Sequence, residues 1–268
     1  MKKKKVIGLM STILLGSALL FGCGTEKSSD NSAVKTEKKE EFVYAMSGIY
    51  KPFNFKEDGK LTGFDVEIGE ALAEKMGMTA KPITFPFETM IQGLLDKKFD
   101  AILGSMTVTP ERQKAVNFTD TYYRSGSQIF VSEDNTDIKS AEDVKGKKVG
   151  TTPATNYEQD ALKLTDKANV LTYPQGDIGA LMDLETGRVE AVVADNIFGQ
   201  MAIDTGKLKV KPVGDLIGIN EQAIAVNKDN QQLTEKINKA LAEIIADGTY
   251  EKISMKWFGF NLMDESKK

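Results

Sequence analysis

The segment GSMTVTPERQKAVNFTD (residues 104–120) leads from small polar residues into a helix start that carries an arginine. Thr109 suits the N-cap, Pro110 suits the first helical position, and Arg112 follows two residues later. Free backbone N–H groups and the positive end of the helix dipole collect at such a start. A guanidinium placed there matches both oxygens of a carboxylate. The segment therefore predicts a carboxylate-binding site. The alternative is a capped helix whose arginine pairs with a surface acid.

Two apolar strands end in polar residues that could complete this site. The first ends at Ser105, with Thr107 just beyond, and the second ends at Asp195. In open α/β sheets, ligands bind beyond the carboxyl ends of the strands. Arg112 and hydroxyls on one wall of a cleft, with Asp195 on the other, would match the carboxylate and ammonium of a zwitterion. The alternative for Asp195 is a loop or helix-capping aspartate.

The elements that position these residues follow from apolar spacing. Short buried strands alternate with amphipathic helices, which favours βαβ units and a largely parallel sheet. We expect strands at residues 42–46, 81–85 and 99–103, and helices at 65–76, from Glu88, and from Leu233 to a stop at Gly248.

A faint internal repeat relates two of these helix–strand units. Residues 87–105 align without a gap with residues 177–195, and Leu94/Leu184 and Ala101/Ala191 are identical. Seven of the other 17 paired positions match in type. The repeat predicts two related α/β lobes. Chance similarity between two amphipathic units is the alternative.

Composition excludes several classes of chemistry. The chain has 268 residues, no histidine and one cysteine, Cys23. There is thus no Ser-His-Asp triad, no His–metal site, no intrachain disulfide and no cysteine cluster for zinc. We expect neither a catalytic residue nor a cofactor or metal.

The N-terminus has the pattern of a lipoprotein signal peptide. The positive segment MKKKK precedes an apolar run, residues 6–22, that ends in Leu-Phe-Gly before Cys23. This resembles a bacterial lipobox, in which the cysteine is lipidated and cleavage follows. Phe21 is larger than the usual residue there. A plain secretory signal and an uncleaved anchor are the alternatives.

The segment after Cys23 predicts a tether outside the cytoplasm. Residues 24–41 are polar, charged and free of aromatic residues, which is typical of disorder. Loss of residues 1–22 removes four lysines and leaves 31 basic against 39 acidic residues. The resulting charge of −8 argues against a nucleic-acid partner. We expect a monomer that is anchored to the cell membrane by its lipid.

Taken together, several motifs resemble the family 3 bacterial solute-binding proteins, the polar amino-acid-binding proteins of ABC transporters. The resemblance covers residues 42–262. Its motifs are YKPFNF (50–55), GKLTGFDVEIGEAL (59–72), DKKFDAILGSMTVTPERQKAVNFTDTYY (96–123), DIKSAEDVKGKKVG (137–150), GRVEAVVADN (187–196) and DGTYEKISMKWFG (247–259).

The resemblance implies a two-lobed, periplasmic-binding-protein-like α/β fold, a Venus flytrap with two crossover hinge strands. The crossovers would lie near residues 128–133 and 221–226. The resulting expected domains are a signal peptide (1–22), a tether (23–41), lobe 1 (42–128 plus 227–262), lobe 2 (134–220) and a tail (263–268).

The resemblance also implies which residues hold an amino acid. Arg112 would bind the α-carboxylate, helped by Thr107 and by main-chain groups near Ser105. Asp195 would bind the α-ammonium.

Further ligand contacts are implied around the side chain. Tyr50 and Phe87 would sandwich it, although core packing is the commoner fate of aromatic residues. In the loop 152–157, Thr155 and Asn156 stand where the family offers backbone N–H groups to the carboxylate. The loop departs from the family's Gly-Thr-Thr pattern, so we expect the backbone to approach the ligand differently.

The position of Ser47 bears on the ligand. Members that bind lysine or arginine often carry an acid there, so Ser47 favours a neutral polar ligand such as glutamine, cysteine or cystine. Glu88 could still serve a cation, which leaves a basic amino acid as the alternative.

The function implied is capture of an L-amino acid for delivery to a separate ABC permease, without catalysis. Two other readings stay open. A dehydratase-type enzyme on this fold would need a dedicated acid or base, for which no candidate stands out. A sensory surface module would bind the same ligand but feed no transporter.

Overall fold

The computed structural model describes residues 39–206 and 208–264. The predicted signal peptide and Cys23 lie outside these ranges, as do most of the tether and the last four residues of the tail. Among the described residues, no helix has the length and apolar character needed to cross a membrane.

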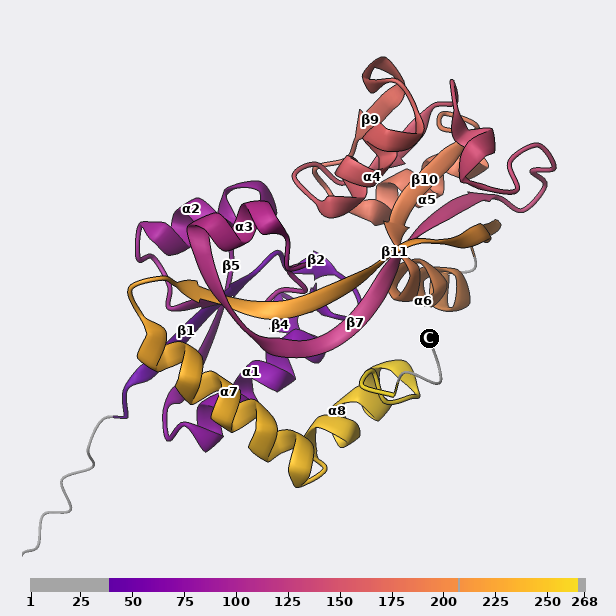
Figure 1. Ribbon diagram of the computed structural model, residues 1–268. Helices are drawn as coiled ribbons and strands as arrows, with labels where there is room; N and C mark the ends of the chain where they lie inside the picture. The colour runs from indigo at the N-terminus through magenta and orange to yellow at the C-terminus, as the bar shows by residue number, and fades with distance from the viewer. Residues whose placement is uncertain (1–38, 207, 265–268) are drawn as a thin grey trace, which may run out of the picture. The chain divides into compact units, whose positions relative to one another are not determined.

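An eight-stranded sheet carries the fold, in the order β5-β1-β6-β11-β7-β10-β8-β9 (Figure 1). At one end β1 is parallel to β5 and β6, and at the other β8 is parallel to β9 and β10. The expected parallel pairing is therefore confirmed in the outer strands. At the centre, β7 and β11 are antiparallel to each other and to their neighbours. The strands are β1 Glu41–Met46, β5 Thr79–Thr84, β6 Ala101–Ile102, β7 Val116–Ser132, β8 Val149–Thr151, β9 Val170–Thr172, β10 Ala191–Asp195 and β11 Val210–Asn227.

The central pair explains why the sheet is not parallel throughout. β7 and β11 are by far the longest strands, and they run side by side between the two parallel halves (Figure 1). Each takes the chain from one lobe to the other, so they must run in opposite directions. The expected crossovers at 128–133 and 221–226 overlap these strands. The lobe boundaries themselves stay a prediction.

Helices cover the sheet much as the apolar spacing predicts. α3 begins at Pro110, and the hydroxyl of Thr109 accepts the N–H of Arg112 at 3.2 Å, which confirms the predicted helix start. The helix expected from Glu88 begins as a 3-10 turn. The helices are α1 Phe64–Lys75, η1 Phe87–Thr89, α2 Met90–Leu95, α3 Pro110–Ala115, η2 Ala141–Val144, α4 Asn156–Leu164, η3 Lys167–Asn169, α5 Asp177–Glu185, α6 Asn196–Gly206, α7 Gln231–Ala246 and α8 Thr249–Phe258.

A small second sheet and an aromatic core complete the first lobe. The second sheet joins β2 Ile49–Tyr50, β3 Asn54–Glu57 and β4 Lys60–Thr62. Beside it, Phe53 stacks on Tyr123 at 5.1 Å and packs against Phe258 at 4.9 Å. Aromatic pairs of this kind add to the burial of apolar area.

The contact between α1 and β1 is close at Gly69. A Cβ atom there would lie 2.3 Å from the ring of Tyr44, whose hydroxyl donates to the carbonyl of Val66 at 3.0 Å. We predict that Gly69→Ala lowers the free energy of unfolding by about 1–3 kcal/mol through overpacking. The melting temperature should fall by roughly 2–4 °C per kcal/mol.

Gly179→Ala is the matched control. Gly179 also lies in a helix, but its added Cβ would meet only Tyr173, at 3.4 Å. Alanine should there be neutral or stabilising by up to about 1 kcal/mol. Equal melting temperatures for the two variants would contradict this account of the α1–β1 contact.

Candidate functional site

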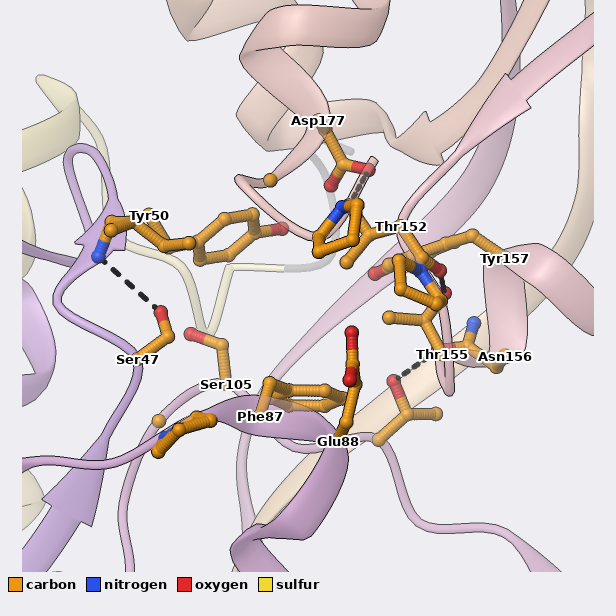
Figure 2. Close-up of a pocket in the computed structure, with 17 residues that line it drawn as sticks. Ser47, Tyr50, Phe87, Glu88, Ser105, Thr152, Thr155, Asn156, Tyr157 and Asp177 are labelled. Carbon is orange, nitrogen blue, oxygen red and sulfur yellow. Dashed lines mark hydrogen bonds between the residues drawn. The ribbon is translucent and has the colours of Figure 1, made fainter. Parts of the chain in front are cut away.

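A cavity of about 220 Å³ lies between the two lobes (Figure 2). One wall comes from the turns after β1, β5 and β6, and the other from the segments that lead into α4 and α5. The lining residues are Ser47, Ile49, Tyr50, Pro86, Phe87, Glu88, Gly104, Ser105, Thr107, Thr152, Pro153, Thr155, Asn156, Tyr157, Pro174, Gly176 and Asp177. Seven of the nine predicted ligand-binding residues are thus brought together. Arg112 and Asp195 lie just outside the lining.

Arg112 lies at the edge of the cavity and carries an uncompensated charge. Its guanidinium donates to the carbonyl of Thr107 at 2.7 Å and to the carbonyl of Ala154, in the other lobe, at 3.0 Å. No carboxylate of the described residues lies within ion-pair distance of it. Burial lowers the pKa of Arg112 to about 10, so it stays protonated at neutral pH. The alternative of a surface ion pair is therefore not what the structure shows.

The two predicted aromatic residues occupy the cavity differently. The guanidinium of Arg112 lies over the ring of Phe87, with its Cζ atom 5.5 Å from the ring centroid. Tyr50 stacks on Phe53 at 5.1 Å and on Phe198 of α6 at 4.5 Å. Its ring thus packs within an aromatic stack that reaches both lobes, and its hydroxyl points into the cavity (Figure 2).

Asp65, a residue that the sequence reasoning missed, holds two of the lining serines in place. Its buried carboxylate accepts from the hydroxyl of Ser105 at 3.0 Å, from Tyr122 at 2.8 Å and from the amide of Asn54 at 2.7 Å. Asn54 in turn accepts from the hydroxyl of Ser47 at 2.9 Å. Burial raises the pKa of Asp65 to about 6, against the lowering effect of these donors.

Ser105 has a backbone conformation that few non-glycine residues adopt. Its φ is 57°, in the left-handed region, and its N–H donates to the hydroxyl of Tyr122 at 2.9 Å. Such a conformation costs free energy and persists only where the surroundings fix it. Asp65 and Tyr122 supply that fixation, so the orientation of Ser105 depends on a buried acid behind the cavity wall.

The loop that leads into α4 contacts the first lobe through Asn156. Thr107 donates to the side-chain oxygen of Asn156 at 2.9 Å. Thr155 caps α4 by accepting the N–H of Glu158 at 3.2 Å. Its neighbour Ala154, whose carbonyl binds Arg112, has a φ of 60°. The loop that departs from the family pattern is therefore a strained turn against Arg112.

Asp195 lies behind the cavity wall, fully buried. It accepts the N–H groups of Ile197 at 2.9 Å and Phe198 at 3.0 Å, which caps α6. Its other oxygen accepts from Ser125 and, at 2.8 Å, from the hydroxyl of Tyr157, a lining residue. Burial raises the pKa of Asp195. Asp195 thus has the helix-capping geometry, and its contact with an ammonium stays a prediction.

Asp177 is a second acid that sequence reasoning missed. It is the first residue of α5, is 3% exposed and lines the cavity. Its carboxylate accepts from the hydroxyl of Thr152 at 2.5 Å, and burial raises its pKa to about 6. The sequence held a signal only for its partner Thr152, which directly follows the end of β8.

The chain is similar to known proteins in sequence and in fold. The family model for bacterial extracellular solute-binding proteins, family 3, matches residues 42–260. The chain is 38% identical to the probable amino-acid-binding protein YxeM of Bacillus subtilis, over all of both chains. It is 32% identical to the L-cystine-binding protein TcyJ of Escherichia coli K12, over 96% of each. An ancestral arginine-binding protein bound to arginine superposes with a TM-score of 0.77 at 39% identity, covering 83% of this chain and 100% of that one. All three are binding proteins.

The raised pKa of Asp65 predicts a pH dependence of stability. Between its ordinary value of 3.8 and about 6, the folded protein binds more protons than the unfolded chain. The contribution of Asp65 to the free energy of unfolding therefore falls as pH rises through this window. We expect the stability advantage of the wild type over Asp65→Asn to shrink by roughly 2 kcal/mol from pH 4.5 to 7.5.

Denaturant titrations of both proteins at the two pH values would measure this difference. Other titrating groups are common to both and cancel. An advantage that grows with pH would show that Asp65 is ionised more readily in the folded state.

Proposed function

Because the chain belongs to the bacterial extracellular solute-binding proteins, family 3, we propose that it binds an L-amino acid between its lobes. It delivers this ligand to an ABC permease, and lipid on Cys23 ties it to the cell membrane. The observation that supports this proposal best is Arg112, a half-buried guanidinium at the cavity edge that meets two carbonyls and no carboxylate of the described chain.

The free α-carboxylate of an amino acid is the partner that fits Arg112. A guanidinium binds both oxygens of a carboxylate, and such charge-assisted bonds are stronger than those to neutral carbonyls. Ser105 and Thr107 line the same wall and add hydroxyl groups. The α-ammonium is assigned to Asp195. In this assignment the ammonium replaces donors from which Asp195 accepts hydrogen bonds in the present structure.

Two features of the cavity bear on the charge of the ligand's side chain, and they favour different answers. Ser47, with no charge, favours a neutral polar group, as in glutamine, cysteine or cystine. A basic side chain instead requires a carboxylate elsewhere in the lining, where Glu88 and Asp177 stand. The relatives point both ways, since one binds cystine by name and another was solved with arginine.

Closure of the two lobes over the ligand explains how occupancy reaches the permease. Arg112 and Thr107 contact the second lobe directly, at Ala154 and Asn156. A ligand held by the same side chains would stabilise the closed arrangement through its differential affinity for it. The permease then recognises a closed, loaded protein.

Removing the guanidinium tests the carboxylate assignment. We predict that Arg112→Ala weakens binding of the ligand by at least about 30-fold, because truncating one partner of a buried charge pair costs about 2–5 kcal/mol. Isothermal titration of the purified chain with the best-bound amino acid measures the loss.

Arg188→Ala is the control for this experiment. Arg188 is an exposed arginine that pairs with Asp183 at 3.3 Å, away from the cavity lining. Its removal should leave the affinity within about twofold. A loss of less than threefold in Arg112→Ala would mean that Arg112 is not the carboxylate anchor.

The lipid anchor has its own test. In bacterial cells fed labelled palmitate, the wild-type protein should take up the label and fractionate with membranes. Cys23→Ser should do neither, because it lacks the sulfur that carries the diacylglyceryl group. Equal labelling of both proteins would overturn the assignment of Cys23.

A further inference from the structure

The charged residues of the cavity lining are both acidic. Glu88 comes from η1 in the first lobe, and Asp177 comes from the start of α5 in the second. Figure 2 shows their carboxylates reaching into the cavity from opposite walls. The other lining side chains are neutral.

Of the two acids, Asp177 has the greater need of a counter-charge, because it is buried. It is 3% exposed, and no lysine or arginine of the described residues pairs with it. Thr152 provides a hydrogen bond but no charge. A buried carboxylate without a counter-charge is costly, and a cation that neutralises it binds correspondingly well.

Glu88 faces the same space from an exposed position. It forms no ion pair with the described residues, and it follows Phe87, whose ring already carries a guanidinium. Its charge is partly screened by water, so it adds to the preference for a cation less than Asp177 does.

The charged groups of the ligand assigned so far do not include a partner for either of these two acids. In the proposed function, Arg112 takes the α-carboxylate and Asp195 takes the α-ammonium. A neutral side chain would leave Asp177 buried and unpaired. The distal half of cystine would add an ammonium together with a second carboxylate, so it would bring no net positive charge to these acids. A positively charged side chain neutralises the remaining acids.

On this basis we propose that the ligand carries a guanidinium or ammonium on its side chain, and that Asp177 and Glu88 are the residues that select it. The inference rests on the proposed function, since it takes the amino-acid site as given. The acid absent at Ser47 is thereby supplied from another part of the cavity, chiefly by the second lobe.

L-Arginine and L-citrulline provide the matched probes. They have the same length and nearly the same shape, and they differ in the charge of the terminal group. The wild-type chain, unfolded, washed and refolded to remove carried ligand, should bind arginine at least about 10-fold more tightly. This is the factor expected for one charge-assisted hydrogen bond. Isothermal titration gives both dissociation constants.

The two acids are then neutralised separately. Asp177→Asn should lower the ratio of the two dissociation constants at least fivefold while changing the affinity for citrulline less than threefold. Glu88→Gln should lower the ratio about twofold or more. Because Glu88 is exposed, this second variant tests the proposal even if Asp177→Asn does not fold. Asp204→Asn, an exposed acid on α6, is the control and should leave the ratio unchanged.

Different outcomes overturn different claims. Citrulline, glutamine or cystine bound as tightly as arginine by the wild type would overturn the cationic side chain while leaving the amino-acid site intact. An equal loss for arginine and citrulline in Asp177→Asn would assign Asp177 to the α-ammonium and overturn its selecting role. No binding of any amino acid by the refolded wild type would instead overturn the proposed function itself.

Discussion

Burial of charge without a counter-charge is the constraint on which the cavity and its surroundings depend. Arg112 meets carbonyls, and Asp65, Asp177 and Asp195 meet hydroxyl, amide or backbone N–H donors. The described ion pairs, by contrast, lie at the surface, as between Lys75 and Asp247. Neutral hydrogen bonds satisfy the geometry of a buried charge but leave its field uncompensated. A ligand that carries both signs of charge can supply the counter-charges that these side chains lack.

The central strand β7 connects the two sides of this arrangement. Tyr122 donates to Asp65 behind the first wall, and Ser125, three residues further along, donates to Asp195 behind the second. The strand that joins the lobes thus also holds the buried acids of both. Because Asp65 fixes the left-handed turn at Ser105, the orientation of one wall is set by the same strand that orients the other.

Much of the site could be predicted because it depends on local sequence. Thr109 suits an N-cap and Pro110 suits the first helical position, so together they predict a helix start. The place of Arg112 in the first turn follows from that start. The internal repeat also places Phe87 and Asp177 at equivalent positions, and both line the cavity. The role of Asp177 could not be read in advance, since it depends on a contact with Thr152 and on burial across a long separation in sequence. Likewise, the stacking of Tyr50 on Phe198 of the other lobe has no local signal.

Enantiomer pairs test the central claim most directly, because a clamp on the α-carboxylate and α-ammonium must distinguish the two hands of the α-carbon. The measurement is the thermal shift of the refolded chain with L- and D-forms of each common amino acid and cystine. At about a hundred times the dissociation constant, a bound ligand adds roughly 2.7 kcal/mol, or about 5–10 °C for a chain of this size. The account predicts such a shift for one or a few L-amino acids and little for their D-forms. Equal shifts for both hands, or none with any amino acid, would contradict it.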